Sequence, residues 1–295
     1  MIDKLRLRAL MAEIGPRWAQ DLPGNSQAVK DAYGPFLADA PLEGIAITRD
    51  IPYGPHERQV LDLFVTEGTH DAPVVVFVHG GAFVRGGKRT TDEIYDNVLL
   101  WFARQGYVGV NIEYRLAPES PYPGGAQDLA GAMDWVHANI AAYGGDPSRI
   151  LLIGHSAGGT HAATYAFDPV MGQGGCRAKA VVLVSARLRA DVLPANPNAP
   201  GVRAYFGEDE SLYEQRSPVT YAHLRPVPTF IVIAEYENPL LDVYGLEFAH
   251  RMAAAGGAAP RFVQMRGHNH MSVMAHFNSG EDWLGTQILE FFASV

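Results

Sequence analysis

The stretch that decides the fold spans residues 150–159 and reads ILLIGHSAGG. Its first four residues are apolar and follow the turn residues GGDP, so they predict a buried strand. The small residues after Ser156 predict a tightly packed helix. A strand that enters a helix through one residue forces a sharp turn, and Gly154 and Gly158 allow strand and helix to approach closely. Such a turn presents the Ser156 hydroxyl at the positive end of the helix, as a nucleophile.

A second glycine-rich motif lies upstream. Residues 73–78 read PVVVFV and predict a fully buried strand, which ends at His79 and is followed by Gly80 and Gly81. Glycines free the backbone so that its N–H groups can point into a cavity. Acyl transfer needs such donors because its intermediate carries a negative oxygen, and one donor is worth about 3 kcal/mol. We expect the amides of Gly81, Ala82 and Ala157 to form this oxyanion hole, and the two motifs together predict a serine hydrolase.

These motifs give the chain a family resemblance. It resembles the hormone-sensitive-lipase-like group of bacterial esterases, which have the α/β-hydrolase fold. Residues 114–123, YRLAPESPYP, are similar to the segment that follows the fourth strand in that group. Asp128 and Trp135 stand where the group carries a structural aspartate and tryptophan. The resemblance runs from about Gly44 to the C-terminus.

Two positions depart from the group. Ala82 replaces a third glycine, which the chemistry tolerates because only the backbone N–H is needed. His155 stands where the group usually has aspartate before the serine. Together with YGP at 53–55 and LDL at 61–63, this histidine is similar to the arylformamidase and general carboxylesterase branches. The resemblance therefore leaves ester and formyl amide open as substrates.

The acid of a catalytic triad should follow the serine along the chain, and the histidine should come last. Residues 229–234, TFIVIA, predict a strand, and resembling enzymes carry the acid three residues after its final alanine, which is Glu237 here. Asp242 is the rival, but it suits the start of a helix over 242–254, where a carboxylate favours the helix dipole. Glu235 is expected to pair locally.

The base is expected just after a last strand at 261–265, in the segment GHNHMS at 267–272. The spacing from Gly267 selects His270, as in the resembling family, whereas His268 is expected to point away because side chains alternate along an extended segment. A metal site made of His268, His270 and His276 lacks nearby carboxylate or cysteine ligands. We therefore expect no metal and no organic cofactor. The other histidines, including His155 and His161, are interpreted as structural or surface residues.

Composition sets the broader limits. The chain has 295 residues, of which 47% are hydrophobic, enough for one α/β core. Its net charge of −9 gives no reason to expect nucleic acid or an anionic membrane as a partner. A single cysteine, Cys176, forbids an internal disulfide and suits a reducing compartment. The first eight residues, MIDKLRLR, lack the apolar core of a signal peptide, and no apolar run approaches membrane-spanning length. A cytoplasmic location is expected.

Alternating strands and helices predict a mostly parallel sheet covered by helices on both faces. The expected strands are 44–51, 58–65, 73–78, 107–113, 150–153, 180–185, 229–234 and 261–265, and the expected helices include 91–105 and 123–142. Residues 1–43 are expected to form an N-terminal helical cap segment, and 44–295 an α/β-hydrolase catalytic domain. The stretch 187–228 is rich in proline and glycine and is expected to be an irregular insertion that adds to the cap.

The sequence thus predicts a serine carboxylesterase for short-chain or aryl esters, acting through Ser156, His270 and Glu237 and an acyl-enzyme intermediate. One alternative is an arylformamidase-like amide hydrolase with the same triad, and a more distant one is a non-catalytic ligand-binding scaffold. The expected partner is a small-molecule ester. The residues leave the oligomeric state open, with a homodimer among the alternatives.

Overall fold

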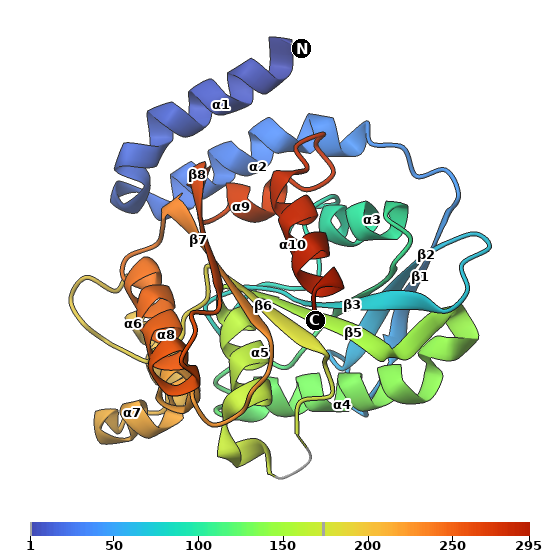
Figure 1. Ribbon diagram of the computed structural model, residues 1–295. Helices are drawn as coiled ribbons and strands as arrows, with labels where there is room; N and C mark the ends of the chain where they lie inside the picture. Colours follow the sequence, from blue (N-terminus) through green and yellow to red (C-terminus); the bar gives the residue numbers. More distant parts are fainter. Residues whose placement is uncertain (1, 173–174) are drawn as a thin grey trace.

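The computed structural model describes residues 2–172 and 175–295, and the strands of this part of the chain form one eight-stranded sheet (Figure 1). Their order across the sheet is β1-β2-β4-β3-β5-β6-β7-β8. The strands are β1 (Ile45–Pro52), β2 (Val60–Thr66), β3 (Ala72–Val78), β4 (Val108–Ile112), β5 (Gly145–His155), β6 (Ala180–Val184), β7 (Thr229–Tyr236) and β8 (Arg261–Asn269). β1 and β2 run antiparallel to their neighbours, and β3 to β8 are all parallel. The predicted mostly parallel sheet is confirmed.

Helices cover both faces of this sheet, which is why its central strands are apolar on both sides (Figure 1). One face carries α3 (Asp96–Arg104), α9 (Ser272–Ala275) and α10 (Trp283–Ala293), together with the N-terminal helices. The other face carries α4 (Gly124–Asn139), α5 (Ala157–Phe167) and α8 (Leu241–Gly256). None of the described helices is long and apolar enough to cross a membrane.

The N-terminal segment consists of α1 (Ile2–Ile14), the 3-10 helix η1 (Gly15–Gln20) and α2 (Leu22–Ala38). It packs near β7, β8 and α9. Leu7, Met11 and Ile14 of α1 are buried, whereas Leu5 is 69% exposed. Met1 lies outside the described residues.

The stretch 187–228 differs from expectation because it contains regular structure. It holds α6 (Ala199–Phe206), the short helix α7 (Tyr213–Arg216) and two 3-10 turns. Pro200 lies in the first turn of α6, where a backbone N–H has no helical partner to lose. Gly207 ends the same helix with a φ of 93°. The proline and glycine that suggested irregular chain therefore mark the two ends of a helix.

Two other boundaries differ as well. The helix predicted from residue 91 begins only at Asp96, because the Thr91 hydroxyl accepts hydrogen bonds from the amides of Glu93 and Ile94 and holds a turn there. The C-terminal helix α10 was not predicted from the sequence. Its buried side chains, including Leu284, Ile288 and Phe292, close the core on the face that also carries α3.

Candidate active site

Ser156 stands alone between β5 and α5, in the sharp turn that the sequence predicts. Its φ of 55° and ψ of −119° are strained for a residue with a side chain. The turn is possible because two glycines remove obstructing Cβ atoms: one at Gly154 would lie 2.5 Å from the carbonyl oxygen of Gly158, and one at Gly158 would lie 2.2 Å from that of Val78. The hydroxyl is consequently held at the N-terminal end of α5.

Parallel pairing brings the other expected site residues to the same edge of the sheet. In the register, Val78 pairs with Gly154, so the loop after β3 leaves the sheet beside the turn of Ser156. β7 and β8 end at this edge too, and the segments that follow them carry Glu237 and His270. Residues distant in sequence therefore meet at the carboxyl ends of their strands.

The structure brings Ser156, His270 and Glu237 into one hydrogen-bonded row. The Ser156 hydroxyl lies 3.1 Å from Nε2 of His270, and Nδ1 of His270 lies 2.9 Å from Oε2 of Glu237. The side chains of His270 and Glu237 are 11% and 3% exposed. This geometry lets a neutral imidazole accept the serine proton at Nε2 while its Nδ1–H donates to the carboxylate.

The other oxygen of Glu237 is held by two donors. Oε1 accepts a hydrogen bond from the Ala234 amide at 2.8 Å and another from the hydroxyl of Ser185, which follows β6. Sequence reasoning missed Ser185, although its place directly after a buried apolar strand was a usable signal. Asp242, the rival acid, lies in the first turn of α8, as a helix-start residue would. Glu235 does not pair with a neighbour in sequence: its carboxylate accepts from the amide of Gly267 on the adjacent strand β8, at 2.6 Å.

The remaining candidate histidines do not join this row. His268 lies 3.2 Å from the Ser272 hydroxyl through Nδ1, and His276 contacts the Ser272 carbonyl oxygen. Both nitrogens of His270 already face Ser156 and Glu237. Among the described residues, no group of three or more histidine, cysteine or carboxylate side chains is arranged to hold a metal ion.

The loop after β3 has the backbone of an anion-binding turn. Gly81, Ala82 and Phe83 have φ values of 148°, 49° and 72°. A Cβ added at Gly80 would lie 3.0 Å from the Cβ of Ser156, so the loop lies against the nucleophile. Within the part of the chain that the structure describes, the amides of Gly81, Ala82 and Ala157 donate to no protein acceptor. They therefore stay available to a ligand.

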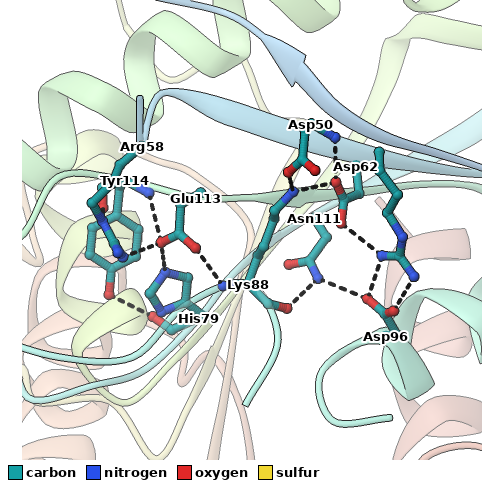
Figure 2. A network of polar contacts seen from close by, with 10 residues as sticks. Asp50, Arg58, Asp62, His79, Lys88, Asp96, Asn111, Glu113 and Tyr114 are labelled. Atoms are coloured by element: carbon teal, nitrogen blue, oxygen red, sulfur yellow. Dashed lines mark hydrogen bonds and ion pairs between the residues drawn. The ribbon is translucent and has the colours of Figure 1, made fainter. Parts of the chain in front are cut away.

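Polar contacts behind this loop fix its position (Figure 2). Glu113, which follows β4, accepts hydrogen bonds from Nε2 of His79 at 2.8 Å, from the Lys88 amide at 2.9 Å and from Arg58. Burial alone would raise the pKa of Glu113, but the bonds from His79 and the charge of Arg58 lower it below its ordinary value. The Tyr114 hydroxyl also donates to the carbonyl oxygen of His79, at 2.9 Å.

The far end of the loop is held by a second charge cluster (Figure 2). The ammonium of Lys88 contacts the carboxylates of Asp50 and Asp62. Arg49 bridges Asp62, at 2.7 Å, to Asp96 at the start of α3. These contacts join the loop to β1, β2 and α3, so both of its ends are attached to the sheet.

Comparison with known proteins shows which family the chain belongs to. A protein-family model described as BD-FAE matches residues 61–170, which include both glycine-rich motifs but neither Glu237 nor His270. Esterase LipQ of Mycobacterium tuberculosis is 29% identical over 244 residues, which cover 76% of this chain and 57% of LipQ. Esterase LipI of the same organism is 30% identical over 236 residues, which cover 73% of this chain and 70% of LipI. The chain belongs to the α/β-hydrolase esterases.

A solved structure shows the same fold. Esterase B from Lactobacillus rhamnosis has a TM-score of 0.74 at 20% sequence identity, over 97% of this chain and 96% of that one. The likeness concerns the fold. Among the curated relatives, the chain spans 57% of the length of LipQ.

Proposed function

We propose that the protein is a serine carboxylesterase that hydrolyses short-chain or aryl carboxylic esters. The observation that carries the proposal is the row of Ser156, His270 and Glu237, with heavy-atom distances of 3.1 and 2.9 Å. The family and the esterase names of its relatives support the same reaction class.

The proposed reaction proceeds in two halves. His270 takes the proton of Ser156 as its oxygen attacks the ester carbonyl carbon, and Glu237 stabilises the imidazolium that forms. The negative oxygen of the tetrahedral intermediate accepts hydrogen bonds from the amides of Gly81, Ala82 and Ala157. The C–O bond to the alcohol breaks as His270 returns the proton to the leaving oxygen. Water, deprotonated by the same imidazole, then releases the acid from Ser156.

Two further properties belong to the proposal. The net charge of −9 supports a small-molecule partner rather than nucleic acid or an anionic membrane, and the single cysteine supports a cytoplasmic location. The N-terminal helices and the stretch 187–228 are proposed to act as a cap. Support for the cap comes from Gly201 of α6, where an added Cβ would lie 2.4 Å from the Ala82 carbonyl oxygen.

The amide-hydrolase alternative rested on His155. That side chain is 1% exposed and contacts Tyr95 and the backbone of His270, so it is out of reach of a leaving group. No other observation favours a formyl amide, and this alternative becomes an outcome of the test.

The test is hydrolysis of p-nitrophenyl esters from acetate to dodecanoate. Ser156→Ala, His270→Ala and Glu237→Gln should each lower kcat by about 10³-fold or more, because each breaks the row. Asp242→Asn is the matched carboxylate control and should stay within about twofold of wild type. A phosphonate ester should add its mass to wild type but not to Ser156→Ala.

Other outcomes would change the proposal in distinct ways. An inactive Asp242→Asn beside an active Glu237→Gln would replace the acid and keep the reaction class. A wild type inert on esters but active on a formyl-aryl amide would favour the amide hydrolase. Inertness on both, with no phosphonate adduct, would favour the binding scaffold.

A further inference from the structure

His155, the residue directly before the nucleophile, makes two side-chain hydrogen bonds to other functional segments. Its Nε2 lies 3.0 Å from the carbonyl oxygen of His270, and its Nδ1 lies 2.9 Å from the hydroxyl of Tyr95. The ring is 1% exposed. The backbone of His270, the proposed base, is therefore hydrogen-bonded directly to His155, the residue next to Ser156.

Acceptor chemistry fixes the proton on this ring. A carbonyl oxygen can only accept, so Nε2 of His155 is the protonated nitrogen. In the neutral ring Nδ1 is then an acceptor, and the Tyr95 hydroxyl donates to it. Burial and the nearby His270 lower the pKa of His155 well below its ordinary value. Neutrality matters because the two imidazole rings lie only 4.9 Å apart, and His270 gains a proton in the proposed reaction.

Tyr95 extends the contact to the loop after β3. Its hydroxyl lies against Gly80, the residue before the expected oxyanion donors, since a Cβ added there would lie 3.3 Å from the Tyr95 oxygen. The side chain is 3% exposed, and burial raises its pKa to about 12, so the hydroxyl keeps its proton. A packing contact therefore joins the loop to Tyr95, and hydrogen bonds run on from Tyr95 through His155 to His270.

The backbone of His270 is consequently held from two sides. Its amide donates to the Tyr236 carbonyl oxygen at 3.1 Å, next to the acid, and its carbonyl accepts from His155. The first bond sets the base relative to Glu237. The second sets it relative to Ser156, because His155 and Ser156 are adjacent in the chain.

We propose that His155 and Tyr95 are positioning residues that hold the oxyanion loop, the nucleophile and the base in register through this hydrogen-bonded bridge. The proposal rests on the proposed esterase function. A carboxylate, which the resembling group usually carries at this position, has no proton to donate to a carbonyl oxygen. The bridge is therefore a feature of a histidine at position 155.

The test compares three substitutions. His155→Gln can keep a donor near the place of Nε2, whereas the shorter His155→Asn leaves the His270 carbonyl without its partner. Tyr95→Phe removes the other half of the bridge. His155→Asn and Tyr95→Phe should lower kcat on p-nitrophenyl acetate by on the order of 10- to 100-fold with little change in KM, because small misplacements of reacting groups are costly. His155→Gln should recover part of the loss.

Tyr33→Phe is the matched control, since Tyr33 is a buried tyrosine, 1% exposed, in helix α2. It should change the melting temperature without changing kcat. Equal losses in His155→Gln and His155→Asn, or lower melting temperatures with kcat within twofold of wild type, would overturn the bridge as a positioning device.

A second measurement does not depend on activity. Long-range ¹⁵N–¹H spectra of the wild type, labelled at histidine, should contain a neutral ring in the Nε2–H form that persists from pH 7 to pH 5.5 and is missing from the spectrum of His155→Gln, because His161 and His276 are neutral as well. A spectrum in which every histidine ring is charged or in the Nδ1–H form at pH 5.5 would contradict the bridge. A wild type that hydrolyses no ester but gives the expected spectrum would contradict the esterase proposal and leave the hydrogen-bonded bridge standing.

Discussion

At the level of single residues, the orientation of Glu237 depends on which hydrogen-bond donors each of its two carboxylate oxygens accepts. Oε1 accepts from Ser185 and from the Ala234 amide, which leaves Oε2 to His270. A carboxylate held in this way presents one fixed lone-pair direction to the imidazole. Ser185 contributes to the site without touching any atom that would react.

Ser185→Ala is therefore expected to lower kcat/KM on p-nitrophenyl acetate by on the order of tenfold, because a hydrogen bond to a charged group is lost. KM should change little. Ser148→Ala is the control, since this exposed serine donates its hydroxyl hydrogen to the nearby Asp146. A lower melting temperature with unchanged kcat/KM would mean that Ser185 serves the fold alone.

The sequence was sufficient to predict those site residues that belong to short-range sequence motifs. The glycines around Ser156 and the distance from Gly267 to His270 are short-range patterns. Ser185, Tyr95 and Lys88 were missed because their partners lie far away along the chain. Tyr95 and His155, for example, are 60 positions apart.

At the scale of elements, α6 lies directly on the oxyanion loop. Phe83 of the loop stacks on Tyr205 of α6, with ring centroids 4.7 Å apart, and Gly201 faces the Ala82 carbonyl oxygen. The helix and the loop therefore share one apolar cluster, which also includes Phe206.

Gly201→Ala is expected to separate α6 from the loop, because its Cβ would lie 2.4 Å from the Ala82 carbonyl oxygen. The result should be a lower melting temperature and a kcat reduced by on the order of tenfold. Gly34→Ala in α2 is the matched control: its Cβ would meet nothing within 4 Å, so it should add about 0.5–1 kcal/mol of stability. Equal melting temperatures for the two variants would contradict the predicted contact.

A second prediction concerns Lys88, which attaches the loop after β3 to strands β1 and β2. Lys88→Met should lower the free energy of unfolding by about 3–5 kcal/mol, because it leaves the fully buried Asp62 with one cation fewer. Urea unfolding measures this loss. Asp62→Asn added to Lys88→Met should restore part of it, and the exposed Lys179→Met should cost almost nothing. A loss below 1 kcal/mol in Lys88→Met would contradict the anchoring role.

The elements themselves were largely predictable. Apolar β-branched runs marked the central strands within a few residues, because those strands are buried on both faces. Helix α6 was missed because its proline and glycine suggested irregular chain. Helix α6 packs on Phe83 through residues more than a hundred positions away in the chain, and a short-range sequence pattern cannot predict such a contact.

At the scale of the whole molecule, the folded chain holds several histidines that stay neutral. His155, His161 and His276 are each 1% exposed. Burial lowers the pKa of His161 and of His276 to about 3, and that of His155 well below its ordinary value. In the unfolded chain each titrates near 6.5.

Stability should therefore be complete above pH 6.5 and fall as the pH drops below it, because only the unfolded chain then takes up these protons. With three such groups, the free energy of unfolding should fall by up to about 4 kcal/mol for each pH unit below this point. Urea unfolding between pH 7.5 and 5.0 measures the slope, and His161→Asn should reduce it by about a third. A free energy of unfolding that is flat over this range would contradict neutral buried histidines.

The hydrogen bond from Ser156 to His270 joins residues 114 positions apart. When the ribosome has just added Ser156, it still has three strands to synthesise, β6, β7 and β8, so the nascent chain carries the serine without its base. During refolding, regain of turnover must likewise wait until β7 and β8 have joined the sheet. Recovery of activity therefore reports when the last strands have joined the sheet. Fluorescence from Trp135, whose ring lies 6.0 Å from that of Tyr143, can recover sooner, whereas Trp101 waits for its C-terminal contact with Asp282.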